Sequence, residues 1–307
     1  MARYLITGGA GFIGSHLVEA LRAAGAAVRV LDDLSTGRVE NLPAGVEFLR
    51  GDVADPATAR RAMAGIDGCF HLAAIASVAR AAEDWPGTHR VNQGGTVAVL
   101  DAARARRVPV VYASSAAIYG DCPNQPIRED APARPLSAYG ADKLGSELHA
   151  AVATGVFAVP TVGLRFFNVY GPRQDPASPY SGVISIFAAR LRRGEPVELH
   201  GDGCQTRDFI HVGDVVAALR AAMARLPPGA PVFNVCTGIG TTIRDLAEAL
   251  AALHGRRAAI RAAPARPGDI RGSVGDPAAA RATLGLGAPV GLRAGLATVR
   301  DWLAGTA

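Results

Sequence analysis

Ser115, Tyr139 and Lys143 have the types and spacing of a proton-transfer site. Tyr139 and Lys143 stand four positions apart at the start of a segment with helical periodicity, so both side chains project from one helix face. Ser115 ends an apolar run typical of a strand, and its hydroxyl can reach the same space. Because a phenol titrates at about pH 10, a nearby cation must lower its pKa before it can accept a proton from a sugar or alcohol hydroxyl.

The lysine of this group is unusual in the composition of the chain. Among the 32 Lys and Arg residues only Lys143 is a lysine. Arg is planar and always charged, whereas Lys is a compact donor whose pKa can be shifted. A chain that otherwise uses Arg throughout is expected to keep Lys where shape or a shifted pKa matters, which favours a functional role for Lys143.

A glycine-rich turn near the N-terminus is typical of a dinucleotide site. The apolar run 3–7 leads directly into Gly8, Gly11 and Gly14, after which apolar residues recur at helical spacing. We expect Gly8 to allow the tight turn, Gly11 to let a pyrophosphate approach the backbone, and Gly14 to let the helix pack on the strand. The helix N-terminus then offers free N–H groups to the anion.

Acidic and small residues follow the next three predicted strands, at the sheet edge where an open α/β sheet binds its ligand. Asp32 and Asp33 end the second strand, and a carboxylate there accepts the ribose hydroxyls and repels a 2'-phosphate, which favours NAD over NADP. Asp52 is expected to hold the adenine amino group. The small residues Ala73 and Ala74 would let the cofactor lie flat.

The elements that must position these residues alternate in the first half of the chain. Such alternation predicts an α/β fold with a doubly wound parallel Rossmann sheet. The strands are expected at 3–7, 27–31, 46–50, 68–72, 108–113 and 160–166, and the helices near 12–24, 56–64, 88–107 and 137–153.

The pattern changes after Asn168, where a loop rich in Pro, Gly and Ser precedes shorter mixed elements. We expect an NAD-binding domain over 1–167, to which the chain returns at about 207–235, and a smaller interleaved α/β substrate-binding domain formed mainly by 168–307. Its predicted elements are strands at 197–199 and 209–212 and helices near 213–224, 241–253 and 290–303.

Composition excludes several classes of protein. With 307 residues, of which 49% are hydrophobic and 19% charged, the chain can bury a large core. The net charge of +5 comes from scattered Arg residues without interleaved aromatics, so no nucleic-acid partner is predicted. No stretch has the roughly 18 apolar residues of a membrane span. Four dispersed Cys residues indicate neither a disulfide scaffold nor a metal site, and a cytoplasmic location fits best.

Several longer motifs resemble the extended short-chain dehydrogenase/reductase family. They are the glycine-rich turn, the Tyr139–Lys143 segment, Ala113–Gly120, Arg165–Gln174, Gly201–Gly203 and Thr206–Val212. In order and spacing they are most similar to nucleotide-sugar epimerases of the UDP-glucose 4-epimerase type. The resemblance runs from residue 3 to about 285, and the later motifs are more specific than the glycine-rich turn.

The resemblance implies a tightly bound, recycled NAD, a UDP-sugar substrate and roles for further residues. The cofactor site would comprise Gly8, Gly11, Phe12, Ile13, Gly14, Asp32, Asp33, Leu34, Ser35, Thr36, Gly37, Asp52, Val53, Leu72, Ala73, Ala74, Asn92, Tyr139, Lys143 and Phe167. The diphosphate would be held by Asn168, Arg207 and Arg266, the ribose by Asp269, and the uracil by Val183, Glu198, Leu199 and His200. Relatives often dimerise through the helices near 88–107 and 137–153, so a homodimer is also expected.

The residues after Ser115 indicate which reaction follows oxidation at carbon four. Related dehydratases carry an Asp-Glu pair there and decarboxylases usually a Glu, whereas this chain has Ala116 and Ala117. Without a carboxylate near carbons five and six, elimination lacks its catalyst and the 4-keto intermediate is expected to be reduced again. A UDP-glucuronate epimerase or decarboxylase and a 4-keto-sugar reductase of the same fold remain alternatives, because the many Arg residues can supply a cation near carbon six. A non-catalytic NAD-binding regulator is disfavoured by Tyr139 and Lys143.

Ser273 is expected to set the choice of sugar. In the family, a position shortly after the Arg-x-Gly-Asp motif limits the pocket, where a large aromatic residue excludes N-acetyl sugars and a small one admits them. The register places Ser273 at that position, which predicts turnover of UDP-GlcNAc and UDP-GalNAc beside UDP-glucose and UDP-galactose. A register slip of two residues, to Arg271, would remove this inference.

Overall fold

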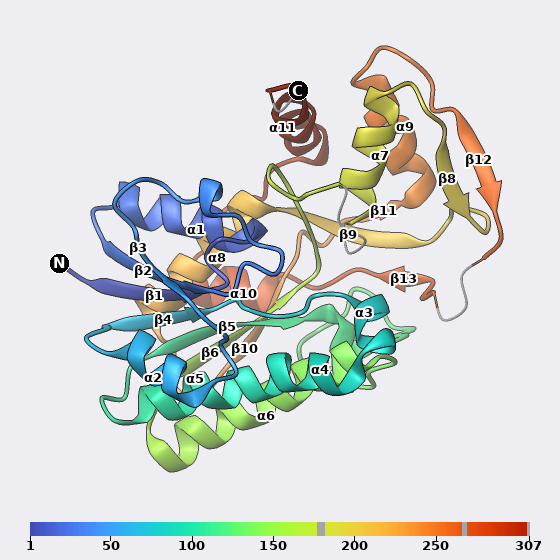
Figure 1. The fold of residues 1–307 in the computed structure, drawn as a ribbon. Helices are drawn as coiled ribbons and strands as arrows, with labels where there is room; N and C mark the ends of the chain where they lie inside the picture. The colour runs from blue at the N-terminus through green and yellow to red at the C-terminus, as the bar shows by residue number, and fades with distance from the viewer. Residues whose placement is uncertain (177–181, 266–268, 306–307) are drawn as a thin grey trace.

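Seven parallel strands form the central sheet in the computed structural model, which describes residues 1–176, 182–265 and 269–305 except for the side chain of Val78 (Figure 1). The strand order is β10-β6-β5-β4-β1-β2-β3, which confirms the predicted doubly wound Rossmann sheet. The strands are β1 (Arg3–Thr7), β2 (Ala27–Asp32), β3 (Glu47–Arg50), β4 (Gly68–His71), β5 (Val110–Ser115), β6 (Thr161–Phe166) and β10 (Val232–Val235).

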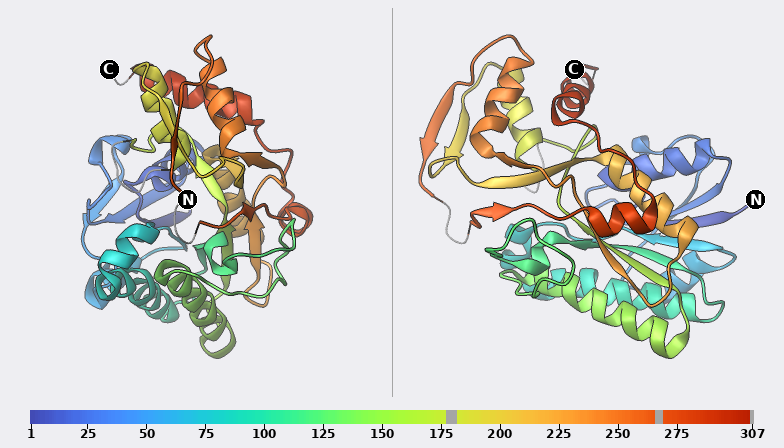
Figure 2. Two further views of the ribbon diagram at one scale, coloured as in Figure 1. Left: turned by 90° about the vertical axis from the view of Figure 1, so that its right-hand side faces the viewer. Right: turned by 180° about the vertical axis from the view of Figure 1, so that it is seen from behind.

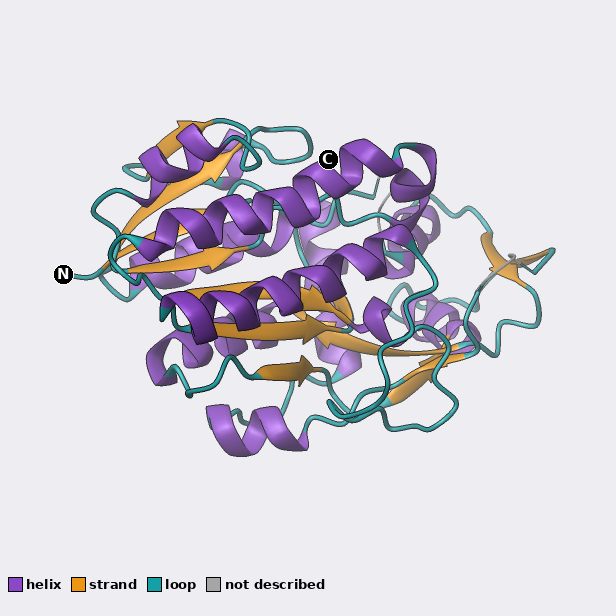
Figure 3. Ribbon diagram, turned by 90° about the horizontal axis from the view of Figure 1, so that it is seen from below, coloured by secondary structure: helices purple, strands orange, loops and turns teal. Residues whose placement is uncertain are grey.

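Helices cover both faces of this sheet (Figures 1 and 3). Neighbouring residues of β1 point to opposite faces, so Ile6 packs beneath α1 and α8 while Leu5 packs against α2, α5 and α6. In the view from behind, α10 lies beside α8 (Figure 2). The bounds are α1 (Phe12–Ala23), α8 (Val212–Arg225) and α10 (Ala278–Leu284) on one face, and α2 (Pro56–Met63), α5 (Gly95–Arg104) and α6 (Ala138–Phe157) on the other.

A smaller part of the chain has its own core and projects beyond the carboxyl ends of the central strands (Figure 1). Its centre is β9 (Thr206–His211), which pairs in parallel with β7 (Asn168–Tyr170) and β13 (Gly272–Ser273) and antiparallel with β11 (Gly240–Thr242). A separate pair joins β8 to β12. These two strands and the surrounding helices are β8 (Val197–His200), β12 (Ile260–Ala263), α7 (Val183–Arg192), α9 (Ile243–Ala252) and α11 (Leu292–Gly305).

The helix predicted at 88–107 is instead three consecutive elements, which corrects that expectation. These are α4 (Trp85–His89), a π-helical turn η2 (Arg90–Gly94) and α5. The wider turn places the Asn92 side chain against the segment after β4, where it bonds both backbone groups of Ile75. The helix predicted at 137–153 is also longer, since α6 continues to Phe157. The remaining short elements are η1 (Val39–Asn41), α3 (Val78–Glu83) and η3 (Ala116–Tyr119).

Among the helices of the described residues, none combines the length and apolar character that crossing a bilayer requires.

A buried ion pair ties α6 to the central sheet. Glu147, one turn beyond Lys143, accepts two hydrogen bonds from the Arg165 guanidinium at 2.9 and 2.8 Å and a third, short one from the Ser114 hydroxyl. Both charged side chains are at most 10% exposed. Arg165 also donates to the Tyr119 hydroxyl at 2.7 Å and to the Glu129 carbonyl at 2.8 Å. The ion pair therefore fixes both α6 and the loop that follows Ser115.

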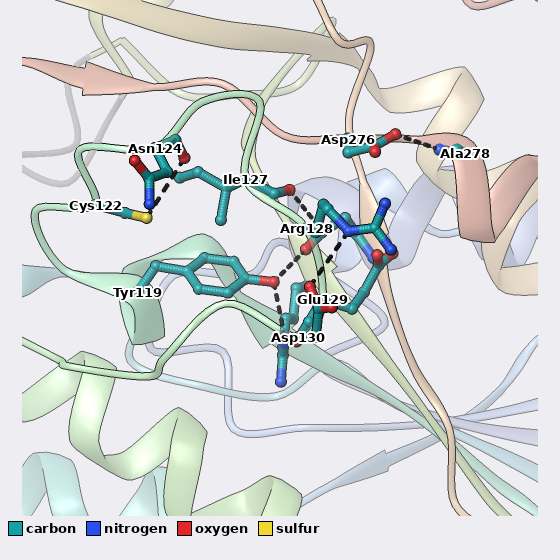
Figure 4. Close-up of polar contacts among 11 residues, drawn as sticks. Tyr119, Cys122, Asn124, Ile127, Arg128, Glu129, Asp130, Asp276 and Ala278 are labelled. Atoms are coloured by element: carbon teal, nitrogen blue, oxygen red, sulfur yellow. Dashed lines mark hydrogen bonds and ion pairs between the residues drawn. The ribbon is translucent and has the colours of Figure 1, made fainter.

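The same loop is held at a second point by its contacts with β10. Tyr119 points toward the segment Ile127–Asp130 (Figure 4). Its hydroxyl donates to Asn234 at 2.7 Å, and the Asn234 amide donates to the Ile127 carbonyl at 2.9 Å. This network leaves the loop at the end of β5 little freedom, which is what a site built on Ser115 requires.

We expect Glu147→Ala to lower the free energy of unfolding by about 3–5 kcal/mol, because it leaves the buried Arg165 charge unpaired. The double variant Glu147→Leu with Arg165→Met replaces the pair by apolar side chains, and its free energy of unfolding should fall much less. Urea denaturation followed by circular dichroism measures both. Glu83→Ala, at an exposed carboxylate, is the control and should change stability by less than about 0.5 kcal/mol. Equal losses in the single and double variants would contradict this account.

Candidate active site

The structure brings Ser115, Tyr139 and Lys143 together at the carboxyl end of β5. The Lys143 ammonium nitrogen lies 5.8 Å from the centre of the Tyr139 ring and donates to the Ala113 carbonyl at 2.9 Å. The Ser115 hydroxyl hydrogen bonds with the Tyr139 phenol and accepts from the Ala117 amide at 3.1 Å. Ser137 caps α6 by accepting from the Gly140 amide, so the helix begins directly before Tyr139.

Burial opposes charge on both titratable side chains. It lowers the pKa of Lys143 from 10.5 to about 8, although the neighbouring Asp142 charge raises it in part. Burial also raises the pKa of Tyr139, and the hydrogen bond with Ser115 lowers it in part. In the chain by itself, Lys143 therefore does not bring the pKa of Tyr139 below its ordinary value. The expectation that the neighbouring cation alone would lower this pKa is not met. Further positive charge at the site is needed to favour the phenolate.

A buried histidine that the sequence analysis missed lies behind the lysine. His71 ends β4, and burial, together with the charge of Lys143, lowers its pKa to about 3, so it is neutral. The Thr7 hydroxyl accepts from the backbone N–H groups of Leu72 and Ala73, so its own proton is donated to His71 Nδ1 at 2.8 Å. Nε2 then donates to Thr96 at 3.1 Å. The network fixes the segment after β4 without adding a second positive charge.

The glycine-rich turn has the shape that a dinucleotide requires. Gly8 has a φ of +70°, and a Cβ there would lie 2.7 Å from the Ala73 nitrogen. A Cβ on Gly14 would lie 2.1 Å from the Gly8 carbonyl oxygen, so the first turn of α1 can pack on the loop only without a side chain. Gly11 caps α1 with no side chain, and Phe12 and Ile13 follow in the first turn. The unfilled space and free helical N–H groups fit a pyrophosphate.

Asp32 and Asp33 organise the loop beside this turn. Asp32 is buried and accepts from the Ala10 and Leu34 amides, both at 2.9 Å, and burial raises its pKa. Asp33 is exposed and accepts from the amide and hydroxyl of Ser35. Gly37 packs on Asp32, since a Cβ there would lie 2.8 Å from the carboxylate. The remaining lone pairs of the Asp32 carboxylate fit ribose hydroxyls, and Thr36 lies in the same loop.

Other predicted cofactor residues have protein partners already. Asp52, predicted to hold the adenine, accepts from the Ala54 amide at 2.8 Å and from Arg90 at 2.6 Å. Asn92 is buried and holds the segment that follows Ala73 and Ala74. Phe167 packs in a buried cluster with Tyr119, Ile127 and Cys236, and Val53 lies in the core. The cofactor roles of these residues stay predictions.

The predicted diphosphate and ribose residues lie side by side. Arg207 Nη2 donates to Asp269 at 2.5 Å and Nη1 donates to the Ile270 carbonyl at 3.0 Å. Gln205, which the sequence analysis missed, donates to the His200 carbonyl at 2.8 Å and to Asp269 at 3.0 Å. A cavity next to them is lined by Gly201, Asp202, Gln205, Ala265, Asp269 and Arg271. Arg266 lies outside the described residues.

In the predicted uracil-lining segment 198–200, two of the three side chains point away from the core. Strand alternation turns Leu199 inward, where it is 1% exposed, while Glu198 and His200 point to the other face. Glu198 is shared between Arg190 and Arg261 at 3.6 and 3.4 Å. Leu199 can therefore contribute only its backbone to a ligand. Val183 begins α7 and is half-buried.

Ser273 is 6% exposed on β13, directly opposite Arg207 in the register of β9. Asn168 begins β7 and lies opposite Phe209 of β9, two residues beyond Arg207. Strand β9 thus places the predicted sugar-limiting position and two predicted diphosphate residues in one sheet.

Comparisons with known proteins, by sequence and by structure, agree with one another. Residues 4–236 match the model of the NAD dependent epimerase/dehydratase family. The UDP-glucose 4-epimerase of Mycolicibacterium smegmatis is 40% identical over 303 residues, which cover 96% of each chain. The structure of Thermotoga maritima UDP-glucose 4-epimerase with UDP-glucose is similar, with a TM-score of 0.95, 36% identity and 99% of each chain covered. That of Thermus thermophilus UDP-glucose 4-epimerase with NAD has a TM-score of 0.92 and 40% identity, over 99% of this chain and 100% of the other.

We expect Lys143→Met to stabilise the chain while it disables the site. Because the pKa of Lys143 falls from 10.5 to about 8 on folding, the cost of burying its charge is fully present below pH 8 and disappears as pH rises toward 10.5. At pH 7 the variant should gain on the order of 1–3 kcal/mol in free energy of unfolding. Urea denaturation at pH 7 and pH 10 tests this, and a gain equal at both values would contradict the assignment.

Proposed function

The chain belongs to the NAD dependent epimerase/dehydratase family and is an NAD-dependent epimerase, and from that premise we propose that it inverts carbon four of a UDP-sugar through a 4-keto intermediate. The observation that carries the proposal is the joint placement of Ser115, Tyr139 and Lys143 beside the glycine-rich turn. The turn, with Asp32 beside it, would hold the cofactor. When bound there, NAD would supply the acceptor for the hydride of carbon four and the donor for its return.

Tyr139 moves the proton in this proposal. Its phenolate takes the proton of the carbon-four hydroxyl as the carbon–hydrogen bond gives up its hydride, leaving a carbonyl at carbon four. Ser115 hydrogen bonds with the phenol and is positioned to donate to the same substrate oxygen. The Lys143 ammonium favours the phenolate electrostatically, and the positive charge of the bound cofactor adds to that effect. In the return step Tyr139 gives the proton back to the new alkoxide.

The surroundings of Ser115 support epimerisation over elimination. Ala116 and Ala117 begin η3 directly after Ser115, and this turn carries no carboxylate. Glu129, a carboxylate further along this loop, accepts a hydrogen bond from the backbone N–H of Asn234 at 2.8 Å. The keto-sugar can then turn about its diphosphate linkage and be reduced on its opposite face, which regenerates the cofactor.

The first test is an assay of purified protein with UDP-galactose, UDP-GalNAc and UDP-glucuronate and no added NAD, with products followed by NMR.

We expect Tyr139→Phe to lower turnover by about 10²–10⁴-fold because the proton acceptor is lost. NAD bound to the variant, measured after denaturation, should stay at the wild-type amount. Turnover within a few-fold of wild type would show that Tyr139 is not the base.

The alternatives have distinct products in the same assay. Carbon dioxide released from UDP-glucuronate would favour the decarboxylase, and turnover that needs added NAD(P)H would favour the 4-keto-sugar reductase. A 4-epimer formed without added cofactor would favour the proposal.

Ser273 supports acceptance of N-acetyl sugars. Its small side chain lies on β13, opposite Arg207 of the neighbouring strand β9. The preceding residue, Gly272, packs against the side-chain amide of Gln125, since a Cβ on Gly272 would lie 2.2 Å from it. A large residue at position 273 would take up space beside the predicted diphosphate site. We therefore propose that UDP-GlcNAc and UDP-GalNAc are substrates beside UDP-glucose and UDP-galactose.

Ser273→Tyr should lower kcat/KM for UDP-GalNAc by at least about 100-fold and that for UDP-galactose by less than about 10-fold, because an added ring removes space for the acetyl group. Ser273→Ala is the matched control and should convert both sugars. Equal losses for both sugars in the tyrosine variant would contradict the assignment.

An exposed apolar stripe supports a homodimer. Leu148, Val152 and Val156 recur every four residues on α6 and are 64%, 49% and 68% exposed, and Val97 on the neighbouring α5 is 40% exposed. A stripe along two adjacent helices is typical of an association surface. We propose that two copies of the chain pack α5 and α6 together.

Leu148→Glu with Val152→Glu should convert the dimer to monomer in sedimentation equilibrium, because two charges would be buried at the interface. Val39→Glu, at an exposed apolar residue on η1, is the control and should leave the mass unchanged. A wild-type protein of monomer mass at micromolar concentration would contradict the proposal.

The proposed location is the cytoplasm. Cys69, Cys122 and Cys236 are buried free thiols and Cys204 is an exposed one, a state that a reducing compartment preserves.

A further inference from the structure

A buried carboxylate with no part in the proposed chemistry precedes the active-site lysine. The Asp142 side chain is 3% exposed. Its Oδ1 lies 2.7 Å from Nδ1 of His89 on α4, whereas its Oδ2 has no hydrogen-bond partner among the described residues. A carboxylate can only accept a hydrogen bond, so His89 carries a proton on Nδ1 and donates it. Burying a carboxylate with one oxygen unpaired is costly, and a compensating interaction is expected.

The buried Lys143 ammonium likewise requires a compensating group of opposite charge. It is 5% exposed, and its one hydrogen bond within the described chain goes to the neutral carbonyl of Ala113. No carboxylate in the described residues forms an ion pair with it. Asp142 is adjacent in the chain and its side chain is also buried, and its negative charge acts on Lys143 against the effect of burial.

The other charged groups on elements packed against α6 are compensated or neutral. On β4, His71 is neutral. On β6, Arg165 is paired with Glu147. On α3 and η2 the charges are exposed and paired near the surface, Arg80 with Glu83 and Asp84 at 3.7 and 4.0 Å and Arg90 with Asp52 at 2.6 Å. On α5, Asp101 pairs with Arg60 and Arg104. On η3 and β5, the titratable side chains are Tyr119 and Tyr112, which stay uncharged because burial raises the pKa of both.

We propose that Asp142, held by His89, is the counter-charge that keeps the Lys143 ammonium protonated. Asp142 acts through Lys143 and touches no reacting atom, so it is a positioning residue whose effect is electrostatic. Its bearing on catalysis rests on the proposed function, whereas the coupling between the two side chains does not. His89 is 53% exposed and links this buried pair to solvent.

The single lysine of the chain makes the coupling directly measurable. Protein with a lysine-free tag, grown with lysine labelled with ¹³C at the ε-carbon, gives one lysine side-chain signal, whose pH titration reports the pKa of Lys143. The wild-type midpoint is expected at about 8. In Asp142→Asn, which preserves shape, the midpoint should fall by about one pH unit. A midpoint within about 0.3 of wild type would overturn the proposal.

The control and a second variant make the result unambiguous. Glu83→Gln removes an exposed carboxylate on a helix packed against α6 and should leave the midpoint unchanged. An unfolded variant would identify itself, because its lysine would titrate at the ordinary value of 10.5. If Asp142→Asn does so, Asp142→Leu, which removes the same charge without leaving a buried amide, takes its place. Its midpoint should fall by a similar amount because the negative charge is again absent, and an unchanged midpoint there would equally overturn the proposal.

Turnover then separates this inference from the proposed function. In Asp142→Asn the alkaline limb of the pH profile of kcat should move to lower pH by the same amount as the NMR midpoint, with KM for UDP-galactose unchanged. A shifted midpoint in a protein that turns over no UDP-sugar would uphold the coupling and reject the function. Normal turnover with an unmoved midpoint would reject the coupling alone.

Discussion

The burial of one ammonium group, that of Lys143, is the constraint on which the site depends. The four-residue spacing brings Lys143 to Tyr139 on one face of α6. The packing of that face against β5 buries the lysine and makes its charge costly. The interior around it is built accordingly. One helical turn further on, Glu147 and Arg165 form a complete ion pair that fixes the helix to the sheet, and His71 on the next strand stays neutral. A charged histidine there would repel the lysine and favour its deprotonation.

Strand β9 connects this catalytic region to the predicted nucleotide-sugar side. It pairs with β7, whose chain follows directly from β6 of the central sheet, and with β13, which carries Ser273. On the same strand, the buried Asp208 accepts from Thr237 and Gly238, which follow β10. The predicted diphosphate residue Arg207 is therefore fixed by backbone pairing relative to the sheet that carries Ser115.

The features that could be predicted from sequence are those encoded by local pattern. The glycine spacing, the strands that precede Gly8 and Asp32, and the four-residue spacing of Tyr139 and Lys143 all reflect backbone geometry, and the family resemblance supplied the reaction class. Long-range contacts were not accessible in this way. Gln205 matters because it meets Asp269 sixty-four residues away, and His89 because it meets Asp142. Strand alternation at 197–200 could have shown that Leu199 faces the core, since Val197 and Leu199 share one face.

The solitary, buried lysine also affects the covalent chemistry of the protein. Reagents that acylate or alkylate amines react with unprotonated, accessible nitrogen, and the chain exposes no lysine side chain to them. Apart from the α-amino group of Met1, its one nucleophilic amine is enclosed between α6 and β5. Covalent labelling at Lys143 therefore requires that the interior open. The labelling rate would report how often the catalytic region opens, because no surface lysine would react beside it.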